Sequence, residues 1–188
     1  MGIFDFFKSN KKDKQDRLYK TYHENGQLEF EGNVKEGKPE GLWKRYYENG
    51  QLKQEGNYKD GKREGLWKFY HENGQLSSEG SLKDEKYEGL WKFYHENGQL
   101  NSEGNFKDGS QGLWKFYHEN GQLKEEGNFK DGEREGLWKE YDENGQLEEE
   151  GNKRSRKSLD KLSKEYLDEL IAVPNKNRFN KETSKSSE

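Results

Sequence analysis

The side chains best suited to metal chemistry are four histidines, which are the only ones in the chain: His23, His71, His95 and His118. Imidazole nitrogens are common zinc ligands, so a recurring row of them is a candidate metal site. Each of these histidines lies just before an Asn-Gly pair, and if each belongs to a separate hairpin, equivalent positions lie about 9.6 Å apart. Zinc needs each nitrogen within about 2.1 Å. We therefore expect the histidines to flank turns and to bind no metal.

Carboxylates are abundant, but their spacing favours a structural role over catalysis. Glutamates recur at one position of successive segments and are predicted to face lysines across a hairpin; examples are Glu55, Glu79, Glu103 and Glu126, with Lys68 and Lys92. Opposite charges on neighbouring strands stabilise a sheet modestly. The chain contains no cysteine, phosphate-binding glycine loop, calcium-loop motif or Ser/His/Asp signature. We therefore expect neither enzymatic activity nor a cofactor.

The composition is unusually polar for a folded protein. Of 188 residues, 38% are charged and 26% hydrophobic, and the mean hydropathy is −1.59, values typical of disordered chains. The 14% aromatic content and the 22 glycines against 2 prolines instead indicate a regular fold. The 34 basic and 38 acidic residues leave no positive excess for nucleic acid. Without a secretory signal, a membrane-spanning apolar stretch or cysteines, we expect a cytoplasmic protein.

A repeat of about 24 residues dominates the sequence. An Asn-Gly pair recurs with its asparagine at positions 25, 49, 73, 97, 120 and 144, and a Gly-Leu-Trp segment accompanies five of the six copies. The array covers residues 17–152. Period-2 alternation on both sides of Asn-Gly predicts one β-hairpin per repeat, with Asn73-Gly74 forming a two-residue type I′ turn. The predicted cross-strand pairs are Glu72–Gln75, His71–Leu76, Phe69–Ser78 and Trp67–Gly80.

Six hairpins in succession predict an all-β repeat fold, a single-layer antiparallel meander of twelve strands. Residues 59–64 and their equivalents are predicted to be polar loops that absorb changes in length. One face carries an aromatic stripe, which a single layer leaves half exposed. We expect its rings to pack on one another and on strand glycines, and also to dock a protein partner. The candidate partner-binding residues are Trp43, Trp67, Phe69, Trp91, Phe93, Trp114, Phe116 and Trp138.

The two ends of the chain depart from the repeat. Residues 1–16 form a tail with three readings: a cap on the first strand edge, a mobile segment, or, less favoured, a membrane anchor through Ile3, Phe4, Phe6 and Phe7. Residues 153–174 are predicted to be a linker and an amphipathic helix that caps the last strand. Residues 175–188 are predicted to be a disordered tail.

The repeated motif, Tyr-x-Glu-Asn-Gly-Gln-Leu followed by Glu-Gly-Asn and Gly-Leu-Trp-Lys-x-Tyr, resembles the bacterial MORN-repeat variant. Proteins similar to this include the YwqK-family antitoxins of toxin–antitoxin systems. The resemblance implies a hairpin array and a non-enzymatic interaction scaffold, antitoxin-like or immunity-like, that binds a partner protein. The alternatives are an array that binds choline or glycans, because aromatic rings hold quaternary ammonium groups, and a membrane-associated scaffold. The sequence leaves the partner and the oligomeric state open.

Overall fold

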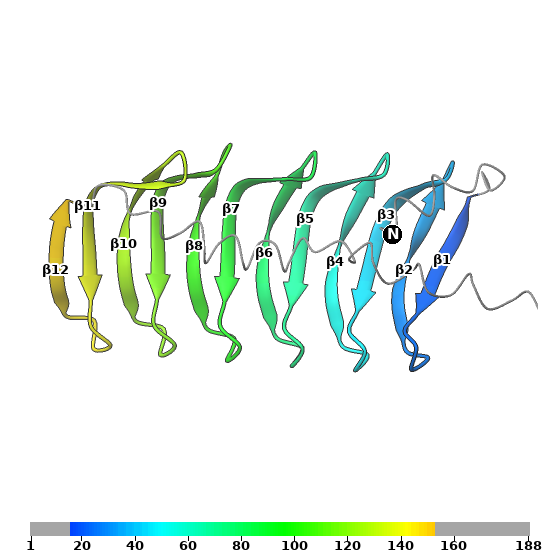
Figure 1. Ribbon diagram of the computed structural model, residues 1–188, viewed down its shortest axis with the longest axis horizontal. Helices are drawn as coiled ribbons and strands as arrows, with labels where there is room; N and C mark the ends of the chain where they lie inside the picture. The colour runs from blue at the N-terminus through cyan, green and yellow to red at the C-terminus, as the bar shows by residue number, and fades with distance from the viewer. Residues whose placement is uncertain (1–15, 153–188) are drawn as a thin grey trace, which may run out of the picture.

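The computed structural model describes residues 16–152, which form one sheet of twelve strands in chain order, each antiparallel to its neighbours (Figure 1). The predicted all-β meander of six hairpins is confirmed. The segments predicted as N-terminal cap, C-terminal helix and tail lie outside the described residues, apart from Asp16. The strands are β1 (Arg17–Tyr22), β2 (Leu28–Lys35), β3 (Lys38–Tyr46), β4 (Leu52–Lys59), β5 (Lys62–Tyr70), β6 (Leu76–Lys83), β7 (Lys86–Tyr94), β8 (Leu100–Phe106), β9 (Ser110–Tyr117), β10 (Leu123–Lys130), β11 (Glu133–Tyr141) and β12 (Leu147–Asn152).

The Asn-Gly turns are not the predicted type I′ turns. Gly74 has φ +84°, whereas Asn73 keeps a negative φ, and the Gly74 N–H donates to the His71 carbonyl at 2.9 Å. This is a type I turn followed by a left-handed glycine, which makes the loop one residue longer. Tyr70 rather than His71 therefore pairs with Leu76. The predicted pairs Phe69–Ser78 and Trp67–Gly80 are confirmed.

Type I′ geometry occurs instead at the opposite end of the sheet. Asp60 and Gly61 both have positive φ, +53° and +83°, and Lys59 pairs directly with Lys62. The expected polar loop is thus a two-residue turn, which matches the right-handed twist of the strands it joins. One repeat is a residue shorter than the others, and the residue is missing from this connection, as predicted. There Phe106 pairs with Ser110, and three residues lie between them.

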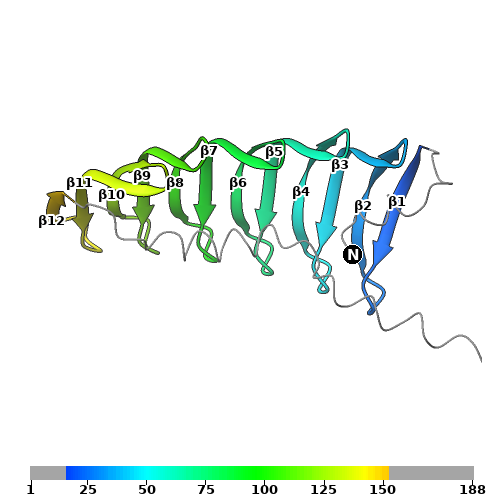
Figure 2. The same cartoon turned by 45° about the horizontal axis from the view of Figure 1, so that its top comes forward.

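A bulge bends each odd-numbered strand from β3 onward. Gly65 of β5 has φ +73°. Toward β4, pairing jumps from Gly56–Trp67 to Asn57–Glu64, whereas toward β6 the pairing runs without a break from Gly65 to Phe69. A bulge of this kind bends and twists the strand that carries it. Figures 1 and 2 show these strands turning sharply near one end. The equivalent bulge glycines, with φ between +69° and +73°, are Gly41, Gly65, Gly89, Gly112 and Gly136.

The hydrophobic core lies inside this bend. Trp91 of β7 is 0% exposed and contacts the Tyr87 ring, which precedes the bend, with 4.3 Å between centroids. It also contacts Phe93, which follows the bend, at 6.1 Å. Both arms of the bent strand therefore enclose the same indole. The indole covers Gly80 so closely that a Cβ built there would lie 2.2 Å from the ring. One folded sheet thus provides two layers of side chains.

Candidate functional site

The predicted partner-binding row is contiguous, but most of it is buried. The rings follow one another along the sheet with centroid distances near 6 Å, as between Phe69 and Trp91 (6.1 Å) and between Phe93 and Trp114 (6.3 Å). Phe93 and Phe116 are partly buried at the margin of this core. The others are inaccessible, with exposed fractions of 3% for Trp43, 1% for Trp67, 2% for Phe69, 0% for Trp91, 5% for Trp114 and 0% for Trp138.

The expectation that these rings stay half exposed is therefore wrong for the five tryptophans and Phe69. The physical reason is the bend, which supplies the covering layer that a flat sheet lacks. The signal was present in the sequence as the glycine of each Gly-Leu-Trp segment, because an isolated glycine inside a strand pattern indicates a bulge. The observed role of these aromatic residues is that of a core.

The opposite face of the sheet exposes one leucine per repeat. These leucines pair across the sheet with polar residues, as Leu66 does with Ser81 and Leu90 with Asn105. At two strands per repeat, successive leucines are about 9.6 Å apart. We call this set the leucine row; its exposed fractions are 59% for Leu18, 50% for Leu42, 54% for Leu66, 51% for Leu90, 48% for Leu113 and 47% for Leu137.

A ladder of alternating lysines and glutamates crosses all twelve strands. Each member faces an opposite charge on every neighbouring strand, as Glu79 faces Lys68 and Lys92. The predicted charge pairing is thus confirmed in register, and it extends over the whole sheet. From β1 to β12 the ladder reads Lys20, Glu31, Lys44, Glu55, Lys68, Glu79, Lys92, Glu103, Lys115, Glu126, Lys139 and Glu150.

The ladder glutamates also accept hydrogen bonds from tyrosines, a contact that the sequence analysis missed. The Tyr94 hydroxyl donates to Glu79 Oε1 at 3.0 Å, and the same bond recurs one repeat earlier from Tyr70 to Glu55 at 2.8 Å. Partial burial raises the pKa of Tyr94, and the hydrogen-bonded Glu79 carboxylate raises it further, to about 12. The same causes raise the pKa of Tyr46 and of Tyr117 to about 12. Ionising a phenol beside a carboxylate is unfavourable, so these bonds favour the neutral phenol.

We expect these tyrosines to weaken the fold in alkali. Because the folded-state pKa of Tyr94 lies above its ordinary value of 10.0, its contribution to stability is fully present below about pH 10 and is lost as the pH rises through about 12. The free energy of unfolding of the wild type should fall between about pH 9 and about pH 11, and that of Tyr94→Phe should fall less over the same range. Urea denaturation at each pH measures both. Tyr22→Phe, at a side chain 60% exposed, serves as the control. An unchanged pH dependence in Tyr94→Phe would contradict this assignment.

The histidines link neighbouring repeats. Nε2 of His71 lies 3.0 Å from the Tyr94 carbonyl oxygen, one repeat further on, and His23 makes the same contact with the Tyr46 carbonyl at 2.9 Å. A carbonyl only accepts hydrogen bonds, so Nε2 carries the proton. Where tyrosine replaces histidine, the Tyr47 hydroxyl makes the equivalent bond at 2.7 Å. In residues 16–152 no three His, Cys, Asp or Glu side chains gather as a metal site would require.

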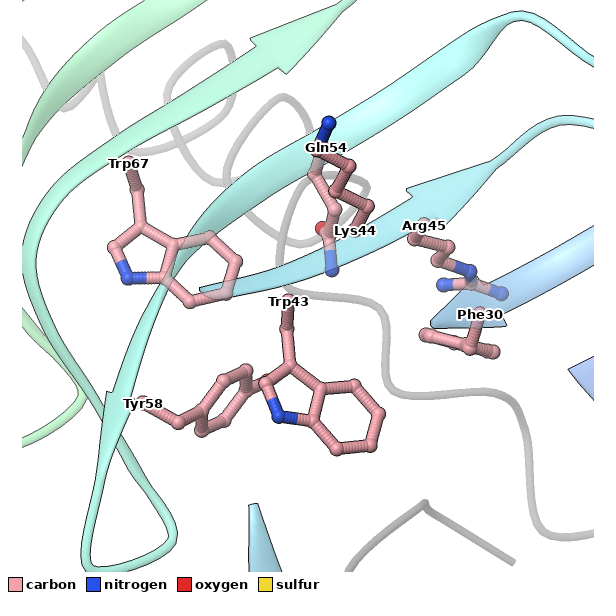
Figure 3. Close-up of a pocket in the computed structure, with 7 residues that line it drawn as sticks. All are labelled: Phe30, Trp43, Lys44, Arg45, Gln54, Tyr58 and Trp67. Atoms are coloured by element: carbon pink, nitrogen blue, oxygen red, sulfur yellow. The ribbon is translucent and has the colours of Figure 1, made fainter. Parts of the chain in front are cut away.

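A hollow on the core face is lined by Trp43 and Trp67 (Figure 3). Tyr58 and Arg45 also line it. Arg45 lies 4.7 Å from the centre of the Phe30 ring. Burial lowers the pKa of its guanidinium, and the Glu29 carboxylate at 3.4 Å opposes that shift. The positive charge of Arg45 disfavours a quaternary ammonium ligand such as choline in this hollow.

In the part of the chain that the structure describes, no helix has the length and apolarity needed to cross a membrane.

Similar solved structures include chains of the complex of accessory secretory proteins 1, 2 and 3 from Streptococcus pneumoniae (12% identity, TM-score 0.33) and of the glycosylation-associated protein complex from Streptococcus agalactiae (14%, 0.34). Each match covers 61% of this chain and 24% of the other, so the protein spans about a quarter of their length. A protein of unknown function from Bacteroides fragilis matches with 12% identity and a TM-score of 0.16, over 74% of this chain and 93% of its own. At these TM-scores the likeness carries no argument about function.

No curated protein matches the chain. The family model described as the MORN repeat variant matches six segments, at residues 18–36, 39–60, 63–84, 87–108, 110–131 and 134–152. These segments coincide with the six hairpins and cover well over half of the sequence. The chain belongs to the MORN repeat variant family.

Proposed function

We propose that this protein is a non-enzymatic scaffold that binds a partner protein through the leucine row. The observation that carries the proposal is the regular exposure of one leucine per repeat on the sheet face opposite the core. Apolar side chains arranged in a patch mark protein-binding surfaces, whereas isolated exposed leucines do not. The repeat aligns six of them across the sheet, from Leu18 to Leu137.

The spacing of the row indicates the kind of partner surface that fits it. Successive leucines are about 9.6 Å apart, and side chains seven positions apart on an α-helix are about 10.5 Å apart. An amphipathic helix laid across the strands therefore presents apolar side chains nearly in step with the leucines. The lysines and glutamates of the ladder lie beside the row and supply charges for the polar flanks of such a helix.

The resemblance to antitoxins makes a toxin the first partner to test, with the scaffold acting as its inhibitor in the cytoplasm. This choice follows from the likeness of the repeated motif to those antitoxins. Choline or glycan binding receives less support, since the tryptophans that would hold such ligands are buried and the hollow between Trp43 and Trp67 is lined by Arg45.

The test is to identify a partner by affinity purification of the full chain and then to measure its dissociation constant with purified components. The triple variant Leu66→Gln/Leu90→Gln/Leu113→Gln should bind at least about tenfold more weakly, because each buried leucine contributes on the order of 1.5 kcal/mol or more. Its melting temperature should change little, as these side chains are about half exposed. The matched control replaces three exposed turn residues by glutamine: Glu48, Glu72 and Glu96. Unchanged affinity in the leucine variant would refute the proposal.

A further inference from the structure

The six Asn-Gly turns have the same sequence, Glu-Asn-Gly-Gln-Leu, and they lie along one edge of the array (Figure 1). In the third turn the Asn73 side chain makes two hydrogen bonds. Its Oδ1 accepts from the Gln75 backbone N–H at 2.9 Å, and its Nδ2 donates to the Glu96 carbonyl of the next repeat at 2.8 Å. Both bonds recur at the asparagines of the first five turns, which are Asn25, Asn49, Asn73, Asn97 and Asn120.

Asn144, in the sixth turn, makes neither bond. The Gln146 backbone N–H donates to Asp142 Oδ1 at 2.8 Å, so a carboxylate has taken the place of the asparagine oxygen as acceptor. Asn144 Nδ2 lies 3.4 Å from Asp142 Oδ2, a long contact within its own turn. Asp142 occupies the position that is histidine or tyrosine in the other five turns. The Asn144 side chain is therefore held less firmly than its five equivalents.

The glycine that follows is held alike in the third and sixth turns. The Gly145 N–H donates to the Asp142 carbonyl at 2.9 Å, as the Gly74 N–H does to the His71 carbonyl at 2.9 Å. The two glycines have nearly the same φ, +80° and +84°. The side chain of the asparagine, and not the backbone of the turn, is thus what distinguishes the sixth turn.

An Asn-Gly pair can undergo a reaction of its own, because glycine has no Cβ to obstruct its nitrogen. The Gly145 nitrogen loses its proton to water and attacks Asn144 Cγ. The N–Cγ bond forms, the Cγ–Nδ2 bond breaks, and ammonia leaves. Water then opens the cyclic imide, giving aspartate if the N–Cγ bond breaks, or isoaspartate if the bond to the backbone carbonyl carbon breaks. The net reaction consumes water and releases ammonia, with no oxidant or reductant.

The attack requires the side chain to turn its Cγ toward the glycine nitrogen, which breaks the bonds that hold the amide. At Asn73 two bonds to backbone groups must break, whereas at Asn144 only the long contact to Asp142 is lost. We propose that Asn144 is a site of spontaneous deamidation in the folded protein, and that the fold protects the other five asparagines of the same motif. The product adds a negative charge beside Asp142 and Glu143.

The first test follows all six sites in one sample of the full-length protein, incubated at mildly alkaline pH and analysed by peptide mass spectrometry. In the folded protein Asn144 should deamidate at least about tenfold faster than each other turn asparagine, because two hydrogen bonds hold each of those amides. In concentrated urea the six should react at one common rate, since their flanking sequence is the same. Equal rates in the folded protein, or the same excess at Asn144 in urea, would overturn the proposal.

The second test restores the histidine of the other turns. In Asp142→His the competing acceptor is gone, so the Gln146 N–H can donate to Asn144 Oδ1 as in the third turn. Deamidation of Asn144 should slow several-fold in the folded variant and keep its rate in urea. Glu143→Gln, which removes a charge from the same turn and leaves these bonds in place, should react like the wild type. An Asp142→His variant that deamidates as fast as the wild type would show that side-chain anchoring does not control the reaction.

Discussion

Replacing Trp91 by alanine should lower the free energy of unfolding by about 3–5 kcal/mol. The side chain is 0% exposed, it lies at the centre of the array, and it contacts rings on both arms of its strand and on the next strand, including Phe106 at 6.4 Å. Its removal leaves a cavity that the hydrogen-bonded strands cannot close by moving together.

Urea denaturation followed by far-ultraviolet circular dichroism measures this loss. The matched control is Leu90→Ala, at the adjacent residue of the same strand, whose side chain is 51% exposed. We expect it to cost less than about 1 kcal/mol, as surface substitutions usually do. Equal losses in the two variants would contradict the assignment of the core to the inside of the bend.

Gly80→Ala is expected to destabilise the protein by about 3 kcal/mol. The added Cβ would lie 2.2 Å from Trp91 Cδ2 and 2.4 Å from its Cε2. The indole is held by its neighbours, so either the ring or the β6–β7 pairing must shift. In an ordinary strand the same substitution is stabilising, because alanine loses less conformational entropy than glycine. Whether Gly80→Ala lowers or raises the free energy of unfolding therefore tests the close contact between Gly80 and Trp91.

The control is Gly151→Ala, at the same repeat position, where no ring among residues 16–152 covers the glycine. It should leave stability unchanged or slightly raised, by up to about 1 kcal/mol. The double variant Gly80→Ala/Trp91→Ala gives a further check, because removing the indole relieves the clash. Its loss should be clearly smaller than the sum of the two single losses, whereas strict additivity would mean that the two residues do not interact.

Much of the sheet could be predicted because the repeat shows each pairing six times. The contact of Trp67 with Gly80 follows from alternation and from the position of the turn, and the structure confirms it. The two-residue turn was predicted at Asn-Gly and is found at Asp-Gly, because both pairs favour positive φ. Only the hydrogen bonds, such as that from Gly74 to His71, show which pair forms the two-residue turn.

The candidate site was harder to predict, because exposure depends on the bend. With Gly65 treated as an ordinary strand residue, the tryptophans face solvent, and with a bulge there they are enclosed. The leucine row gave no signal in the sequence, since one leucine per repeat becomes a surface only when the bend has buried the other face. The Tyr94–Glu79 bond joins residues 15 apart, and alternation alone does not show that the hydroxyl reaches the carboxylate.

The Lys–Glu ladder has a consequence for how the molecule changes in evolution. Its period equals one repeat, so deleting or duplicating a whole repeat rejoins a glutamate to a lysine and a glycine to a tryptophan. Every junction in the sheet is then chemically the same as before. Length can therefore vary in steps of about 9.6 Å without the redesign of a single contact. The length of the exposed leucine row is therefore set by the number of repeats alone.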